Sequence, residues 1–186
     1  MASFRTDPTN LHSVHPDDVL RVDRQVLLNG PVALYGPPER LRQHVAALES
    51  YGYRCPAFDC GGWASEADMH RAFAAGLEFP SYYGRNLNAL NDCLSDIDIP
   101  EKSGVALVLW RFDRFARLPG VRAWDVLDVI AHASWLHSLY ARRLLVLVQS
   151  DDPKLRFPPV GARPVMWIMW EAHKTDEPGA EPDPAT

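Results

Sequence analysis

Short apolar runs alternate with helical patterns through the middle of the chain. Continuous apolar runs are typical of strands buried on both faces, and they occur at 31–35, 104–110, 144–149 and 165–170. Residues 53–60 form a further candidate strand, in which Pro56 lacks a hydrogen-bond donor and favours an irregular or edge position. Strands separated by helices indicate parallel βαβ units. The sequence therefore predicts an α/β fold with a small, mostly parallel sheet and helices packed on it.

Two helices are expected in the first half of this pattern. Pro37 and Pro38 open one of them, because proline is tolerated in the first turn, and Gly52 is placed to end it. Ser65 and Asp68 resemble a capping box at the start of the other. The apolar stripes are Leu41, Val45 and Leu48 in the first helix and Met69, Phe73 and Leu77 in the second.

Two more helices are expected in the second half. A short helix runs from about 86 to 96, and its buried stripe is Leu87, Leu90 and Leu94. The longest helix spans 121–140, and its expected apolar face is Trp124, Leu127, Ala131, Trp135 and Leu139. Residues 150–164 hold four prolines and no clear pattern, which predicts a long loop. The tryptophans in apolar runs are expected to be mostly core residues: Trp110, Trp124, Trp135, Trp167 and Trp170.

The composition is that of an ordinary globular chain of 186 residues. A formal net charge of -5 argues against a large surface for nucleic-acid phosphates, because such surfaces are basic. We expect a flexible segment over 1–22, one domain over 23–172 and a disordered acidic tail over 173–186. The first residues lack the apolar core of a signal peptide, and no run approaches the ~20 residues that span a bilayer. A cytoplasmic protein without membrane contact is therefore expected.

Few residues offer catalytic or metal-binding chemistry. The three cysteines, Cys55, Cys60 and Cys93, are too few and too irregularly spaced for a disulfide framework or a zinc site. The segment 34–41 follows a strand and opens a helix, but it lacks the glycines, lysine and hydroxyl residue of a phosphate-binding loop. No nucleophile has a supporting histidine and acid in context. We therefore expect no metal, no cofactor and no enzymatic activity.

The segment FPSYYGRNLNALNDCL at 79–94 carries the most specific pattern. It resembles the signature of the barstar family, in which Pro-x-Tyr-Tyr-Gly-x-Asn-Leu-x-Ala-Leu-x-Asp leads a short helix. The matching residues are Pro80, Tyr82, Tyr83, Gly84, Asn86, Leu87, Ala89, Leu90 and Asp92. The order of elements expected over about 53–149 also resembles the family's order. By this resemblance, 31–51 and 165–170 are additions to the same sheet.

The resemblance implies a protein inhibitor of the immunity or antitoxin type. In the family, the short helix and the loop before it cover the active site of a small ribonuclease, and a helix carboxylate takes the place of a substrate phosphate. Asp92 matches that carboxylate. A carboxylate on a rigid helix can pair with several of the cations that hold phosphate in such an enzyme. The implied partner is a small, probably basic nuclease or toxin, bound one to one by a monomer.

Helical spacing places several candidate contact residues on one face. Arg85, Asn88, Asp92 and Asp96 follow steps of three and four residues, and Asn91 lies beside them. The loop before the helix contributes Tyr82, Tyr83 and Gly84. The acidic area continues through Asp98 and Glu101. These residues are the predicted partner-binding set: Tyr82, Tyr83, Gly84, Arg85, Asn88, Asn91, Asp92 and Asp96.

Structural roles are also expected within this segment. Gly84 is expected to need a positive φ, and Asn86 to cap the short helix. Tyr83 fits either the core or the interface. The family's best-known member has an acid at the position of Asn88 and a tryptophan at that of Asn91. Its long helix supplies a further acid, where this chain offers Ser134, His137 and Ser138.

Two other functions are consistent with the sequence. The first is a protein-interaction module on the same fold that inhibits nothing and binds through its N-terminal unit or its acidic tail. The second is a small α/β enzyme that uses Asp92 as an acid or base, although no partner for Asp92 is evident in the sequence.

Overall fold

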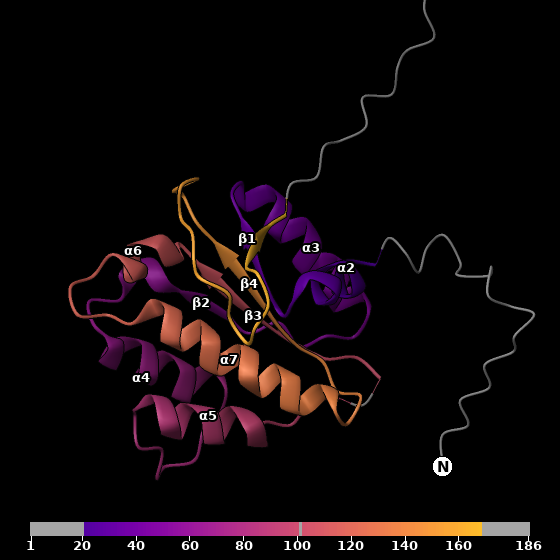
Figure 1. Ribbon diagram of the computed structural model, residues 1–186. Helices are drawn as coiled ribbons and strands as arrows, with labels where there is room; N and C mark the ends of the chain where they lie inside the picture. The colour runs from indigo at the N-terminus through magenta and orange to yellow at the C-terminus, as the bar shows by residue number, and fades with distance from the viewer. Residues whose placement is uncertain (1–20, 101, 169–186) are drawn as a thin grey trace, which may run out of the picture.

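All five strands of the described chain belong to one parallel sheet (Figure 1). The structure is a computed structural model that describes residues 21–100 and 102–168. The strand order is β2-β3-β4-β1-β5. The strands are β1 (Val32–Tyr35), β2 (Ala57–Asp59), β3 (Val105–Trp110), β4 (Leu144–Gln149) and β5 (Met166–Trp167). The predicted α/β fold class is confirmed.

Helices connect most of these strands. They are α2 (Val22–Asn29), α3 (Pro38–Ser50), α4 (Glu66–Gly76), α5 (Leu87–Asp96), α6 (Phe112–Ala116) and α7 (Ala123–Ser138). Four of them, α3, α4, α5 and α7, lie in segments that the sequence predicted to be helical. The sequence prediction missed α2 and α6, because eight and five residues are too few to show a helical period.

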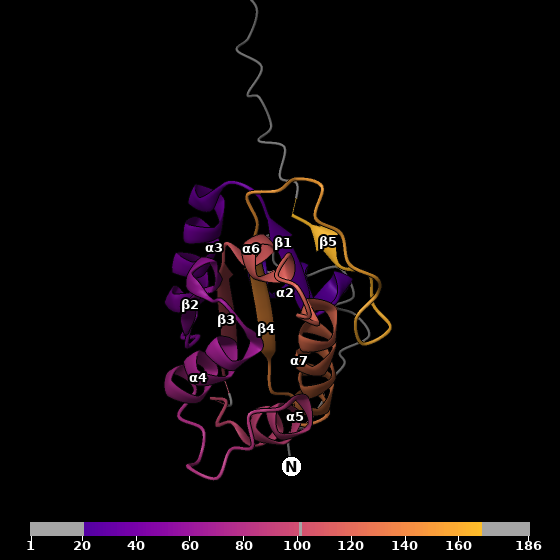
Figure 2. The same ribbon diagram turned by 90° about the vertical axis from the view of Figure 1, so that its left-hand side faces the viewer.

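Both faces of the sheet are buried, and successive strand residues alternate between them (Figure 2). On one face Leu34 and Leu107 pack with residues of α4, α5, α6 and α7. On the other face Ala33 and Ala106 pack with residues of α2 and α3. This arrangement explains why the strand segments read as continuous apolar runs rather than alternating ones.

The first and last strands extend the sheet at one side. β1 pairs with β4, with Val32 opposite Val146, and β5 pairs with β1, with Ala33 opposite Met166. The segments 31–51 and 165–168 therefore add to the sheet formed by β2, β3 and β4, as the sequence predicted. At the opposite edge β2 has only three residues and begins after Pro56. That edge position agrees with the prediction from the missing proline donor.

The predicted apolar face of α7 is wrong. Trp124, Trp135 and Leu139 are 38, 56 and 61% exposed, so they do not belong to the core. The buried residues are Ala123, Val126, Leu127, Ile130, Ala131, Ala133, Ser134 and His137. The buried face is turned by about 100°, one residue step, from the predicted face. The helix carries apolar residues around much of its circumference, so their spacing alone did not identify the face that packs on the sheet.

Two smaller predictions also need correction. The tryptophans are not mostly core residues, since Trp110 and Trp167 are only partly buried. Ser65 precedes α4 as predicted, but the reciprocal capping box is absent. The Asp68 carboxylate instead accepts hydrogen bonds from the Ala64 N–H and the Ser65 hydroxyl.

Several predictions concern residues that the structure does not describe. They include the flexible segment up to residue 20, the acidic tail over 173–186, Glu101 and Trp170. The domain boundaries at 23 and 172 stay a prediction. Within 21–100 and 102–168, none of the helices combines the length and the apolar character needed to cross a membrane.

A buried carboxylate joins α2 to the rest of the fold. Asp23 is 1% exposed and accepts hydrogen bonds from the Arg21 guanidinium at 3.0 Å and the Tyr53 hydroxyl at 3.0 Å. Arg143, which precedes β4, lies 3.8 Å from the same carboxylate. Burial by itself would raise the pKa of Asp23, but the hydrogen bonds from Arg21 and Tyr53 outweigh it and hold that pKa below its usual value.

Asp23→Asn should lower the free energy of unfolding by about 2 kcal/mol at pH 7, because the charge-assisted bonds to Arg21 are lost. Asp23 has a depressed pKa in the folded state, so its contribution is present above the unfolded pKa and is lost as pH falls below about 4. Urea unfolding at several pH values should therefore show the two proteins converging in acid. Asp92→Asn, at an exposed carboxylate, is the matched control and should leave the midpoint unchanged.

Candidate functional site

The loop between α4 and α5 makes two unusual backbone turns. Glu78 and Arg85 have φ of 57° and 49°, in the left-handed region that side chains disfavour. Gly84 does not have a positive φ, so that prediction is wrong by one residue. The glycine has a different role, because a Cβ there would lie 3.2 Å from Asn86 Nδ2 and 3.4 Å from Ala89 Cβ. A side chain at this position would crowd the first turn of α5.

The start of α5 is fixed by a side-chain cap. The Asn86 side-chain oxygen accepts a hydrogen bond from the Ala89 N–H at 2.9 Å, which confirms the predicted cap. Leu90 and Leu94 are fully buried, and Leu87 is partly buried against the same core. The opposite face of α5 is therefore held outward toward solvent.

A buried histidine fixes the end of α5 to α7. His137 Nε2–H donates to the Leu94 carbonyl oxygen at 2.8 Å. In the same helix the Ser134 hydroxyl donates to the Leu144 carbonyl oxygen at 2.7 Å. Both side chains are 4% exposed and point inward. Of the three residues that stand where the family's long helix offers an acid, only Ser138 is exposed.

The two adjacent tyrosines have opposite environments. Tyr83 is 8% exposed, packs edge-on against Phe79 and is hydrogen-bonded through its hydroxyl to His70 Nδ1. Burial lowers the pKa of His70 and raises that of Tyr83, so both groups are neutral near pH 7. Tyr82 is 84% exposed. Tyr83 therefore anchors the loop, and Tyr82 is the side chain available for contact.

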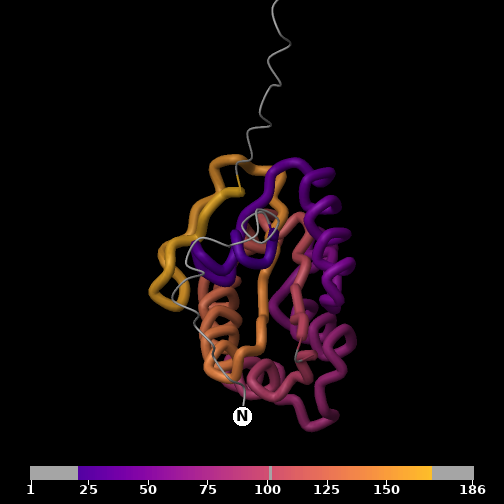
Figure 3. Tube along the Cα trace, turned by 90° about the vertical axis from the view of Figure 1, so that its right-hand side faces the viewer, coloured from indigo at the N-terminus to yellow at the C-terminus, as the bar shows by residue number. Residues whose placement is uncertain are grey.

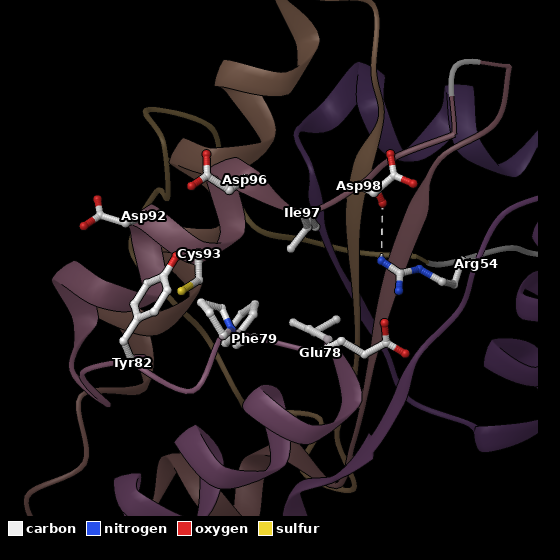
Figure 4. Close-up of a pocket in the computed structure, with 11 residues that line it drawn as sticks. Arg54, Glu78, Phe79, Tyr82, Asp92, Cys93, Asp96, Ile97 and Asp98 are labelled. Atoms are coloured by element: carbon white, nitrogen blue, oxygen red, sulfur yellow. Dashed lines mark hydrogen bonds between the residues drawn. The ribbon is translucent and has the colours of Figure 1, made fainter.

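An open, acidic pocket lies between this loop and α5 (Figure 4). Its volume is about 410 Å³. Four carboxylates and a single guanidinium line it: Glu78, Asp92, Asp96, Asp98 and Arg54. The Tyr82 ring extends from the loop toward Cys93 and Asp92. The excess of carboxylates gives the pocket a negative potential that favours a cationic group.

The structure brings only part of the predicted binding set into this pocket. Tyr82, Asp92 and Asp96 line it together. Arg85 and Asn88 are exposed on α5 or just before it, and Asn91 is half-buried. Gly84 is exposed, but its role is to make room for α5. The predicted set thus separates into three pocket residues, a helix row beside them and a loop anchor.

Three groups in the pocket were not in the predicted binding set. Arg54 donates from Nη2 to the Asp98 carbonyl oxygen at 3.4 Å and so joins β2's approach to the end of α5. Glu78 follows α4 without a motif of its own. Cys93 is half-buried, and burial together with Asp92 and Asp96 raises the pKa of its thiol. Across the described ranges, no three His, Cys, Asp or Glu side chains gather as a possible metal site.

Tyr83→Phe should lower the free energy of unfolding by about 1–2 kcal/mol, because it leaves the buried His70 ring nitrogen without its partner. Tyr82→Phe removes the same oxygen from the neighbouring, exposed residue and should change stability by less than about 0.5 kcal/mol. Urea unfolding of the two variants and the wild type tests this difference. Equal effects of the two exchanges would contradict the assignment of Tyr83 as the anchor.

Comparison with known proteins agrees with this geometry. Residues 53–149 match the family model described as Barstar (barnase inhibitor). The "Putative ribonuclease inhibitor YrdF" of Bacillus subtilis (strain 168) is 44% identical over 66 residues, which cover 35% of this chain and 68% of that protein.

Two solved structures of other proteins share part of the architecture. One is the Aeropyrum pernix ORC2 protein (TM-score 0.45, 14% identity), matched over 73% of this chain and 40% of that chain. The other is Drosophila ORC bound to AT-rich DNA and Cdc6 (TM-score 0.46, 16% identity), matched over 70% of this chain and 43% of that chain. The matched segment of 53–149 contains β2 to β4, α4 to α7 and the whole acidic pocket. The chain belongs to the Barstar family of barnase inhibitors.

Proposed function

We propose that this protein inhibits a small nuclease by covering its active site with the α4–α5 loop and the exposed face of α5. The observation that carries the proposal is the acidic pocket, in which Tyr82, Asp92 and Asp96 meet on the segment that matches the family. The related protein from Bacillus subtilis is itself named as a ribonuclease inhibitor. The proposal assigns the chain no catalytic activity.

The proposed contact depends on charge complementarity. Nuclease active sites collect cationic side chains to hold phosphate, and a carboxylate can pair with several of them at once. Asp92 is exposed on α5, whose position is fixed by its Asn86 cap and by His137. A rigid helix loses little freedom when the partner binds, so more of the interaction energy is kept. In this role Asp92 takes the place of a substrate phosphate.

Tyr82 supplies the apolar part of the contact. Its exposed ring stands beside the carboxylates, and tyrosine at the centre of an interface offers a large rigid area with a polar tip. A cation that enters the pocket would meet this ring as well as Asp92 and Asp96. The Tyr83 anchor keeps the loop, and therefore Tyr82, in place before the partner arrives.

The amides on α5 bear on the choice of partner. Asn88 lies one turn before Asp92, where a second acid would strengthen the negative potential. An amide there can donate as well as accept hydrogen bonds, so it suits a nuclease with fewer cations or with an acceptor at this point. We therefore propose a small basic nuclease or toxin as the target, bound one per chain in the cytoplasm of the cell that makes it.

Asp92→Arg should abolish this binding, because it places a cation against the cations of the nuclease active site. We expect at least a hundredfold loss of affinity, about 2.7 kcal/mol. Inhibition of barnase activity by the purified chain provides the first assay. A pull-down from native cell extract with the wild type and Asp92→Arg as parallel baits, read by mass spectrometry, identifies the natural target.

Glu49→Arg is the matched control, because it makes the same change in net charge at an exposed position on α3. It should bind the nuclease as the wild type does. If Asp92→Arg and Glu49→Arg bind equally, the proposed face is not the interface. A partner held by both baits but lost when the N-terminal unit or the acidic tail is changed would favour an interaction module that inhibits nothing.

A further inference from the structure

The exposed apolar side chains of the described residues concentrate away from the acidic pocket. Eight large apolar residues are exposed in this part of the chain, and Tyr82 is the only one of them in the pocket. The other seven belong to α2, to α7 and the turn after it, and to β5: Leu27, Leu28, Trp124, Trp135, Leu139, Tyr140 and Met166. The proposed inhibitory function does not use them.

Five of these residues form one surface where α2 lies beside α7 (Figure 3). Leu27 and Trp135 line the same open cavity of about 310 Å³ between the two helices. Leu139 follows Trp135 by one helical turn, and Leu28 and Tyr140 adjoin them in sequence. We call this surface the α2–α7 face, defined by Leu27, Leu28, Trp135, Leu139 and Tyr140.

The α2–α7 face is as large as a stable contact between two copies requires. At their exposed fractions, its five side chains present on the order of 500 Å² of mostly apolar surface. The largest apolar patch of a typical monomer is about 300–600 Å² and is often functional. A stable dimer buries about 800 Å² per protomer, about two thirds of it apolar, so this face supplies the apolar part.

The shape of the face is self-complementary. The cavity is walled mainly by small residues: Gly30, Ala131, Ser134, Ser138 and Gly161. Beside it stand the protruding side chains of Trp135, Leu139 and Leu28, which are 56, 61 and 78% exposed. A two-fold axis would let a protruding side chain of each copy enter the cavity of the other. A surface with a hollow and projections side by side needs no other shape to fill it.

The low charge of the face favours the same occupant. Arg163 is the single charged residue among those that line the cavity. A transient partner of opposite charge would find little to select, whereas contacts between identical subunits are the more apolar class. We propose that the α2–α7 face is the interface of a homodimer, which replaces the monomer expected from the family resemblance.

This inference is independent of the proposed nuclease binding. α2 lies outside the segment 53–149 that matches the family, so the dimer interface depends on an addition to the family core. The α4–α5 loop lies at the lower end of the molecule, apart from α2 (Figures 1 and 3). Each copy would therefore keep Tyr82 open to a nuclease of its own.

Sedimentation velocity of the full chain from about 1 to 100 µM tests the proposal. The wild type should sediment as a dimer, and Trp135→Glu should raise the dimer dissociation constant at least a hundredfold, because it places two carboxylates in an apolar contact. Leu28→Glu, on the other helix of the face, should have the same effect. Both residues are exposed in one chain, so urea unfolding should show folded variants.

Tyr82→Glu is the matched control, since it adds the same charge at an exposed aromatic outside the face. It should leave the dimer intact. A wild type that stays monomeric up to about 100 µM would overturn the proposal, as would a dimer that survives both Trp135→Glu and Leu28→Glu. A dimer lost in Tyr82→Glu but kept in the other two variants would assign the contact to the acidic pocket and would equally overturn it.

Discussion

A parallel sheet is stable in water only when helices cover both of its faces, and this fold depends on that constraint. The segment that matches the family supplies α4 to α7, which cover one face. The other face is covered by α2 and α3, both of which lie before the matched segment. Tyr53, Ala106, Val108, Leu145 and Leu147 belong to the matched segment but pack against these two helices.

The N-terminal unit is therefore part of the core rather than an appendage. Asp23 is the point where this dependence is strongest, because its buried carboxylate joins α2 to Tyr53 at the start of the matched segment. A buried acid is stable only with such partners. The C-terminal strand continues the same arrangement, since β5 pairs only through β1.

The acidic pocket rests on the opposite face of the sheet, and its parts have separate physical origins. Buried leucines and the His137 hydrogen bond hold α5 in place. The loop position comes from Tyr83 and His70, and the negative potential comes from carboxylates of α5 and the segments on both sides of it. None of the charged groups that line the pocket is needed for packing. A rigid frame thus carries a surface whose charge is free to act on another molecule.

The sequence was sufficient to predict the features that depend on local pattern. Continuous apolar runs identified the strands, Pro56 indicated the weak edge, and Asn86 was identified as a cap, because each of these depends on a residue's own chemistry. The face of α7 could not be read, since apolar residues occur around much of the helix and only the sheet decides which of them it covers. Trp135 was consequently placed in the core.

The site shows the same limit. The motif located Tyr82, Asp92 and Asp96, but Arg54 reaches the pocket from a segment that is distant in sequence, and no local signal announces such a contact. The positive φ fell on Arg85 instead of Gly84, because the glycine answers the crowding at Ala89 rather than a turn. Steric contacts between residues that are not neighbours are visible only in the folded chain.

The two tyrosines at 82 and 83 have a consequence for how such a protein can change over generations. One residue carries the structural duty of the loop, and its neighbour carries the outward contact, so selection acts on them separately. Exchanges at position 82 can alter what the surface recognises at little thermodynamic risk, whereas position 83 is constrained by a buried histidine. A lineage built in this way can follow a changing adversary while its scaffold stays the same.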